Sequence, residues 1–258
     1  MMARLMPIRV AHIYRYPVKG LTPEPLARVA IAPGQGLPHD RRFALAHGTT
    51  RFDPAAPEWL PKSNFLMLMK NERLARLKTH FDAESGILAI ERDGRKVAGA
   101  DITQPAGRLV IEQFFAAFMG VECRGMPRLV EAPGHMFSDT PPKVVSLIGL
   151  DSIRDLERVT RAPVDHRRFR ANLYVAGAAP WQEFDWVGRE LSIGATRLRV
   201  VKRIERCAAT NVNPDSAARD MNLPRSLRLG FDHVDMGVYA EVVQGGAIAV
   251  GDSFAPPA

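Results

Sequence analysis

Cys207 is the residue of this chain whose neighbours point most directly to chemistry. It follows a segment, residues 197–203, in which basic and apolar residues alternate, and it precedes a polar turn. Lys202, Arg203 and Arg206 place positive charge beside the thiol. Nearby positive charge favours the thiolate, the form that binds metals and attacks electrophiles. The sequence therefore predicts a reactive or metal-binding cysteine at the end of a strand.

Few other residues in the chain have the spacing of a metal or nucleotide site. The second cysteine, Cys123, has no comparable neighbours, so we expect it to be structural. Two cysteines cannot complete a four-cysteine zinc or iron–sulfur site. The seven histidines lack ligand spacing, and the P-loop, Gly-x-Gly-x-x-Gly and Gly-x-Ser-x-Gly motifs are absent. A metal held by Cys207 would therefore take most of its ligands from elsewhere than cysteine.

The composition is typical of a globular protein with an anionic partner. Of 258 residues, 46% are hydrophobic and 24% are charged. No apolar stretch approaches the roughly 20 residues that span a bilayer, and no signal-peptide core precedes Pro7. We therefore expect a cytoplasmic protein without a membrane partner. The net charge of +7 favours an anionic ligand, but the cations are scattered and only 7% of residues are aromatic. A phosphorylated cofactor is thus favoured over nucleic acid, with an inert basic surface as the remaining alternative.

Short apolar runs between glycines and prolines predict a mainly β protein of the α+β class with a few short helices. The Asp93-Gly94 pair predicts a two-residue hairpin turn, because both positions tolerate positive φ. Helices are expected over residues 109–119 and 151–159, the second capped by Asp151 or Ser152. The expected strands are residues 8–17, 25–32, 42–46, 65–69, 73–80, 87–91, 173–175, 190–193, 196–204, 237–243 and 247–250.

A cluster of glycines and prolines between residues 120 and 143 predicts a boundary between two halves. We expect an N-terminal β domain over residues 1–120, a linker over 121–142 and a C-terminal domain over 143–258. The linker also contains apolar residues, which indicates that the two halves pack together.

Three separated segments resemble the MOSC proteins, a family named after the C-terminal domain of molybdenum-cofactor sulfurase. Each segment is weakly specific alone, but the ordered set extends over nearly the whole chain. The segments are Tyr16-Pro17-Val18-Lys19, Phe169-Arg170-Ala171-Asn172, and Arg206-Cys207 followed by Thr210, Val212 and Pro214. The resemblance implies an N-terminal MOSC-type β domain packed on a C-terminal β-barrel. It also implies a molybdenum–molybdopterin cofactor whose metal is bound by the motif cysteine.

The residue types at these positions suit such a cofactor. One thiolate, from Cys207, is enough for a metal that a pterin dithiolene already holds. Lys19 could bind the pterin phosphate as a point charge, and Arg41 and Arg170 could bind it in a bidentate manner. Asn172 offers both a donor and an acceptor to a pterin edge. The other expected site residues are Gly20, which stands where the family often has serine, and Thr140, Arg206, Thr210, Asn211 and Tyr239.

The resemblance implies an oxidoreductase, because the family has members that reduce amidoximes. The expected reaction is reduction of the N–O bond of a small N-hydroxylated substrate, with Cys207 as the catalytic metal ligand. No iron–sulfur domain follows Phe254 in the sequence, so separate electron-transfer proteins are the expected partners. One alternative stays open, in which Cys207 carries sulfur as a persulfide and the chain is a sulfur-transfer protein.

Overall fold

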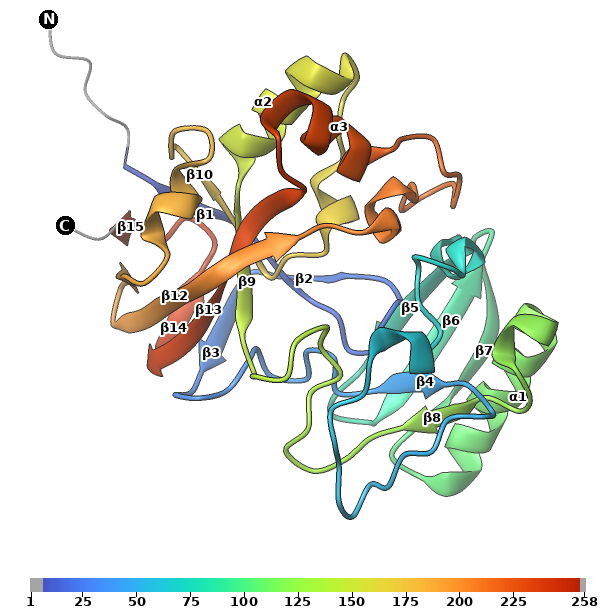
Figure 1. Ribbon diagram of the computed structural model, residues 1–258. Coiled ribbons are helices and arrows are strands. Elements are labelled where there is room, and N and C mark those ends of the chain that lie inside the picture. The colour runs from blue at the N-terminus through green and yellow to red at the C-terminus, as the bar shows by residue number, and fades with distance from the viewer. Residues whose placement is uncertain (1–6, 256–258) are drawn as a thin grey trace, which may run out of the picture.

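An eight-stranded sheet dominates the computed structural model, which describes residues 7–255 (Figure 1). Its strand order is β15-β11-β12-β13-β9-β10-β1-β2, and only the β9–β10 pair is parallel. The strands are β1 (Arg9–Arg15), β2 (Glu24–Leu26), β9 (Val145–Gly149), β10 (Leu173–Ala176), β11 (Glu190–Ile193), β12 (Thr196–Glu205), β13 (Asp235–Gln244) and β15 (Phe254–Ala255).

Backbone hydrogen bonds close this sheet into a barrel. Val10 N donates to Asp252 O at 3.0 Å, and Phe254 N donates to Ile8 O at 2.8 Å. Because β15 also pairs with β11, the first strand and the last strand join the two sides of the sheet. Closure leaves few unpaired backbone groups at sheet edges. The expected mainly β architecture of the α+β class is confirmed.

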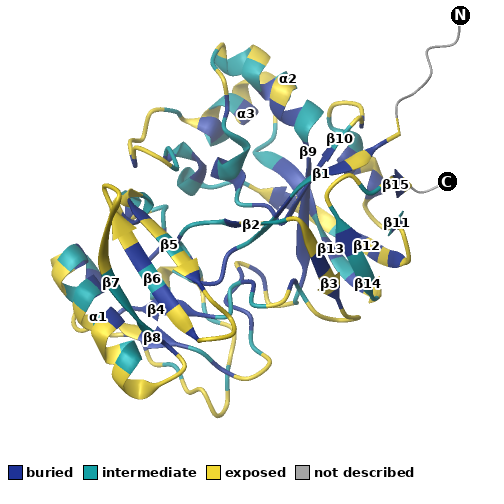
Figure 2. Ribbon diagram, turned by 180° about the vertical axis from the view of Figure 1, so that it is seen from behind, coloured by how far each residue is buried: buried dark blue, intermediate teal, exposed yellow. Residues whose placement is uncertain are grey.

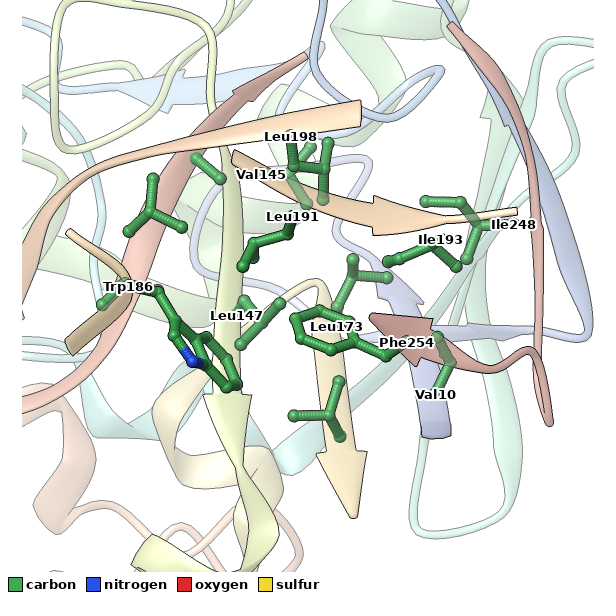
Figure 3. Packing of buried hydrophobic residues seen from close by; sticks show 14 of the residues in the cluster. Val10, Val145, Leu147, Leu173, Trp186, Leu191, Ile193, Leu198, Ile248 and Phe254 are labelled. Carbon is green, nitrogen blue, oxygen red and sulfur yellow. The ribbon is translucent and has the colours of Figure 1, made fainter. Parts of the chain in front are cut away.

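Side chains from the barrel strands fill its interior (Figure 3). Along β12, buried and exposed residues alternate at the start of the strand, which gives one face to the core and one to solvent. Two helices cover another apolar layer, α2 (Leu150–Thr160) and α3 (Leu223–Phe231). They pack through Leu156 and Leu227, both fully buried.

A second unit lies beside the barrel and has its own core (Figures 1 and 2). Helix α1 (Pro105–Met119) packs against its strands through Ile111 and Phe115. Its strands are β4 (Ala44–Ala46), β5 (Leu77–Phe81), β6 (Ile87–Arg92), β7 (Arg95–Asp101) and β8 (Arg128–Val130). We call it the α1 unit. None of the helices in residues 7–255 is both long and apolar enough to cross a bilayer.

The start of the chain pairs with strands of the C-terminal half. β1 lies between β10 and β2 in the barrel sheet, and β3 (Arg28–Ile31) pairs with β14 (Gly246–Ala249). The domain boundaries expected from the sequence stay a prediction, but these pairings tie residues 9–31 to the strands of the C-terminal half.

Short 3₁₀ helices connect many of these elements. They are η1 (Lys62–Asn64), η2 (Glu72–Arg76), η3 (Gly120–Cys123), η4 (His166–Phe169), η5 (Gln182–Trp186) and η6 (Ala208–Asn211). The expected strand over residues 73–80 is half wrong, because its first part is η2. The expected strand over residues 65–69 is wrong as well, since only an isolated bridge from Phe65 to Ala46 forms there.

The turn chemistry at Asp93-Gly94 is confirmed. Both residues have positive φ, 52° and 73°, and they join Arg92 to its partner Arg95 across the β6–β7 hairpin. The expected side-chain cap of α2 is wrong, because the helix begins after Gly149 without a capping side chain. The sequence reasoning also missed β7, β8, β9, β15 and α3.

Candidate functional site

A cavity of 490 Å³ lies where the barrel meets the α1 unit and the loops that precede it. Every residue expected at the site except Asn211 lines this first cavity. Those residues are Lys19, Gly20, Arg41, Thr140, Arg170, Asn172, Arg206, Cys207, Thr210 and Tyr239. Segments separated by almost two hundred residues in the sequence therefore meet at one place.

Cys207 lies just beyond the end of β12, as the sequence predicts, and its side chain is only partly buried. The backbone around it is fixed by η6, because the Cys207 carbonyl accepts hydrogen bonds from Thr210 N at 3.1 Å and from Thr210 Oγ1 at 3.0 Å. Thr210 thus holds the cysteine in place. The thiol is reachable from the cavity while its main chain is anchored.

Arg206 is held by backbone carbonyls rather than by a carboxylate. Its Nε donates to Met236 O at 2.8 Å, and its Nη1 donates to Phe169 O at 2.9 Å. Burial lowers the pKa of Arg206, an effect that nearby Tyr239 partly offsets. No carboxylate among residues 7–255 forms an ion pair with Arg206. Its guanidinium therefore brings a positive charge to the cavity.

Arg41 and Arg170 share one aromatic platform that the sequence reasoning missed. Their guanidinium carbons lie 4.6 and 4.3 Å from the ring centre of Tyr16, which is fully buried. Arg41 also pairs with Asp40 and donates from Nη2 to Arg170 O at 2.9 Å. Stacking on a ring orients a guanidinium without using its hydrogen-bond donors. The place of Tyr16 in the Tyr-Pro-Val-Lys segment could have indicated that it lies at the site.

The guanidinium of Arg170 makes no hydrogen bond to any residue between 7 and 255. Arg170 follows η4 in a left-handed backbone conformation, with φ of 54°, which turns the chain toward the cavity. Burial lowers its pKa to about 10, partly offset by Tyr16 and further lowered by Arg41. A desolvated cation with free donors is a ready partner for an anion.

Lys62 and Asp139 are among the charged residues of the cavity that the sequence reasoning missed. Asp139 pairs with Lys19 and lies 3.6 Å from Lys62 Nζ. Burial alone would lower the pKa of Lys62, but Asp139 and nearby Cys207 raise it. Lys62 therefore carries a positive charge beside the cysteine. The sequence did not indicate that Lys62 lies at the site, because nothing near it resembles a motif.

Lys19 is 7% exposed and belongs to the same charged group. Its Nζ donates to Phe137 O at 2.9 Å as well as to Asp139. Burial lowers the pKa of Lys19, although Asp139 opposes that shift. The segment Phe137-Ser138-Asp139 thus supplies both a carbonyl and a carboxylate to the lysine.

Two expectations about side chains need correction. Asn172 lines the cavity, but its Oδ1 already accepts hydrogen bonds from Ser146 N at 3.1 Å and Ser146 Oγ at 2.8 Å. Both lone pairs of that oxygen are therefore used, and Asn172 has no free acceptor for a ligand. Asn211 does not line the cavity, because its Oδ1 accepts from Leu223 N at 3.0 Å and so supports the start of α3.

Three further expected residues, Gly20, Thr140 and Tyr239, also line the cavity. Gly20 has φ of 83°, a conformation that residues with a Cβ rarely adopt, which explains glycine in place of serine. Thr140 is 4% exposed, and Tyr239 comes from β13. Burial raises the pKa of Tyr239, so its hydroxyl is a neutral donor at neutral pH.

The cavity as a whole suits an anionic ligand with a metal bound at one end. Lys19, Arg41 and Arg168 have carboxylate partners, but Arg170 and Arg206 have none. Among residues 7–255, no group of three or more His, Cys, Asp or Glu residues gathers to hold a metal. The lining thus combines a partly buried thiol with arginines that have no carboxylate partner among the described residues.

Comparison with known proteins matches both halves of the chain to one family. Residues 134–255 match the MOSC domain, and residues 7–124 match the MOSC N-terminal beta barrel domain. The mitochondrial amidoxime-reducing component 1 of Xenopus laevis is 30% identical over 128 residues, which are 45% of this chain and 36% of that protein. The mitochondrial amidoxime reducing component 2 of Rattus norvegicus is 31% identical over 120 residues, 42% of this chain and 35% of that protein. The match thus spans about a third of the length of these relatives.

Two solved structures resemble the fold distantly. The YUAD protein from Bacillus subtilis covers 96% of this chain, and 94% of its own chain is covered, with a TM-score of 0.46 and 11% identity. YiiM from Geobacillus stearothermophilus covers 43% of this chain, and 53% of its own chain is covered, with a TM-score of 0.35 and 16% identity.

Proposed function

Because this chain belongs to the MOSC family, we propose that it binds a molybdenum–molybdopterin cofactor in the first cavity and reduces N-hydroxylated compounds. The proposal draws its reaction from the distant similarity to the amidoxime-reducing components. Separate carrier proteins would supply the electrons. Conversion of N–OH to N–H consumes two electrons and two protons and releases water.

The observation that carries the proposal is the meeting of a reachable thiol with unpaired cations. Cys207 lines the same cavity as Arg170 and Arg206, neither of which has a carboxylate partner among the described residues. Both side chains are only partly exposed, and an anion bound beside them would offset part of the cost of removing their charge from water. A pterin phosphate is such an anion, and a dithiolene supplies the metal ligands that the protein lacks.

Each residue would have a distinct part in holding the cofactor. Cys207 would ligate molybdenum, and Arg170 would bind the phosphate with its free donors. Lys19 and Arg41, already positioned by Asp139 and Asp40, would add further positive charge. The bound metal would supply the two-electron chemistry. Lys62, near the thiol, would add a further positive charge to this end of the cavity.

The test is metal content after expression in cells that synthesise the cofactor. We expect about one molybdenum per chain by elemental analysis, with pterin fluorescence after denaturation. Cys207→Ser should lower the molybdenum content by more than about 100-fold, since loss of a direct ligand exceeds the loss from an outer partner. Cys123→Ser is the matched control and should retain the metal, because the Cys123 thiol is buried in the core of the α1 unit.

The same pair of variants addresses the alternative function, sulfur transfer through a Cys207 persulfide. The partly exposed thiol of Cys207 favours this second candidate, because sulfur transfer requires a thiol that a sulfur donor can reach. A carrier would take up labelled sulfur on Cys207 and contain no molybdenum. Metal-free protein from cofactor-producing cells, together with sulfur labelling that Cys207→Ser abolishes, would replace our proposal with this one.

A further inference from the structure

The segment between η6 and α3, residues 213–222, contacts both halves of the molecule. We call it the strap. It follows η6, the short helix that begins after Cys207, and in Figure 1 it is the orange loop that reaches toward η2 of the N-terminal half. No residue of the strap is among those that line the first cavity. Any effect of the strap on the site must therefore act through the residues that it holds.

A tight turn within the strap reverses the chain. Asn213 Oδ1 accepts hydrogen bonds from Asp215 N at 2.9 Å and from Ser216 N at 3.1 Å. An asparagine side chain that binds backbone groups two and three residues ahead stabilises such a turn. Arg219 then lies opposite Val212, with which it forms an isolated β-bridge. The turn thus brings Arg219 back to the end of η6.

The guanidinium of Arg219 joins the two halves. Its Nη1 donates to Ala208 O, in η6, at 3.2 Å. Its Nη2 donates to Leu68 O at 3.2 Å, to Met69 O at 2.8 Å and to the Glu72 carboxylate at 3.0 Å. A planar guanidinium has several donors in fixed directions, so one side chain can hold acceptors from two separate segments.

The segments that Arg219 joins both contribute to the lining of the first cavity. Leu68 and Met69 line it from the N-terminal half. Cys207 and Ala209, the neighbours of the acceptor in η6, line it from the barrel. The bonds of Arg219 therefore fix the separation between two parts of the lining, next to the thiol.

The strap is held more firmly on the barrel than on the N-terminal half. Arg168, a buried residue of η4, donates from Nη2 to both carboxylate oxygens of Asp220, at 2.7 and 2.9 Å. By contrast, the side chains of Arg219 and Glu72 are 34% and 41% exposed. Exposed ion pairs are weak and are screened by salt. The bonds to the N-terminal half should therefore break before those to the barrel.

We propose that Arg219 is a positioning residue that keeps the first cavity narrow beside Cys207, and that breaking its bonds to residues 68–72 opens a path from solvent to the thiol. The strap would stay on the barrel through Arg168. The inference depends on the bonds of one guanidinium to both halves and on the exposure of its ion pair. It applies equally to a metal cofactor and to a sulfur donor, so it goes beyond the proposed function.

The experiment measures alkylation of Cys207 in the cofactor-free protein, with iodoacetamide and with the bulkier N-phenylmaleimide, by mass spectrometry of the labelled peptides. Arg219→Ala should raise the rate with the bulkier reagent roughly tenfold, because several charge-assisted hydrogen bonds are lost. The increase with iodoacetamide should be smaller. Loss of a nearby positive charge would by itself slow labelling, because it disfavours the thiolate. A faster rate therefore reports access to Cys207.

Arg225→Ala is the matched control. Arg225 is an exposed arginine of α3, close to the strap in sequence, and its side chain forms no ion pair with any residue between 7 and 255. Arg219→Lys keeps the charge opposite Glu72, but one ammonium group cannot replace the fork of a guanidinium. Its labelling rate should lie between those of the wild type and Arg219→Ala. Buried Cys123 reports unfolding in the same samples.

Salt gives a second measurement on the unmodified chain. Raising NaCl from about 0.05 M to about 0.5 M should quicken Cys207 labelling in the wild type, and Arg219→Ala should abolish that response. A Cys207 rate in Arg219→Ala no faster than in Arg225→Ala would overturn the inference. An equal rise at Cys123 would overturn it too, because Arg219 would then stabilise the whole fold.

If Arg219→Ala does not fold, Arg219→Lys and the salt response of the wild type are held to the same criteria. No step of the experiment requires molybdenum. Its outcome is therefore separate from that of the metal analysis, and either proposal can fail while the other stands.

Discussion

The two walls of the first cavity are built in different ways. The barrel wall consists of Arg170, Asn172, Arg206, Cys207 and Tyr239, which lie on barrel strands or in the turns next to them. The loop wall consists of Lys19, Arg41, Lys62 and Asp139, which lie in turns and a short 3₁₀ helix. Backbone carbonyls and Ser146 hold the barrel wall, whereas ion pairs between side chains hold most of the loop wall.

This difference assigns different tasks to the two walls. Hydrogen bonds from Arg206 to Met236 O and Phe169 O tie the barrel wall to the main chain. In the loop wall, Asp139 pairs with Lys19 and Lys62, and its own side chain is 45% exposed. Exposed ion pairs are weak and adjustable. We infer that the barrel wall fixes the position of Cys207 and that the loop wall adapts to what binds.

Arg206→Ala should have the largest effect on stability. It removes hydrogen bonds from a charged donor and leaves two carbonyl groups without partners, which should cost about 3 kcal/mol of unfolding free energy. Chemical denaturation of the cofactor-free protein measures this. The control is Arg199→Ala, because Arg199 lies on β12, the strand that Arg206 follows, and pairs with exposed Glu190. A destabilisation no larger than that of the control would contradict the fixed barrel wall.

Arg170→Ala should affect binding rather than folding. Its guanidinium makes no hydrogen bond within residues 7–255, so little stability is lost. Loss of charge-assisted hydrogen bonds to a phosphate, worth about 1.5–3 kcal/mol, should weaken cofactor retention about 10- to 100-fold. Molybdenum content during dialysis reports the loss. A strong fall in unfolding free energy with retention unchanged would show that Arg170 is structural.

Asp139→Asn should have a smaller effect, confined to the loop wall. It leaves Lys19 and Lys62 without their carboxylate, and Lys19 is buried. We expect a destabilisation of about 1 kcal/mol, limited by the exposure of Asp139. Amide exchange should quicken in the loops around residues 62 and 139 while the barrel strands stay protected. Faster exchange in β12 or β13 would show that the two walls are not independent.

The smallest expected effect is on how stability depends on pH near η4, the 3₁₀ helix that precedes Arg170 of the barrel wall. His166 begins η4, stacks on His12 at 4.7 Å and bonds the Tyr14 hydroxyl at 3.1 Å. Burial, with the nearby His12, lowers the pKa of His166 from 6.5. The unfolded chain therefore binds the proton more tightly, so stability is lost as pH falls below about 6.5 and is regained as pH rises.

His166→Gln should flatten this part of the stability profile. The contribution of one histidine stays below about 1.4 kcal/mol per pH unit. Thermal unfolding between pH 5 and 7.5 measures it, with exposed His80 replaced by glutamine as the control. A slope that His166→Gln leaves as steep as in the wild type would rule out this role.

The sequence predicted the barrel wall better than the loop wall, for a physical reason. Cys207, Arg206 and Arg170 stand in contiguous segments whose local pattern shows a strand end beside charge. Lys62 has no such pattern, because its place at the cavity depends on how a loop folds back on Asp139. The sequence indicated that Asn172 lies at the site but not which hydrogen bonds it makes, because its partner Ser146 is 26 residues away in the chain.

The missed elements have a similar explanation. All five residues of β9 are buried, so this strand has no alternation of polar and apolar residues to reveal it. Helix α3 has only nine residues and begins with proline near its first position. The start of α3 depends on Asn211, whose side chain was expected from the sequence to bind the cofactor. By contrast, the Asp93-Gly94 turn was predictable because its conformation depends on two adjacent residues alone.

Closure of the barrel by Ile8, Val10, Asp252 and Phe254 has a consequence for biosynthesis. A ribosome produces the first strand long before the residues that complete its pairing, and β10 is also far away in the chain. The β5–β6–β7 meander, whose contacts are local, can form while synthesis continues. The α1 unit should therefore be protected from proteases on stalled nascent chains that still lack β15. The barrel, and with it the cavity that joins Lys19 to Cys207, should become protected only when the last strand has emerged.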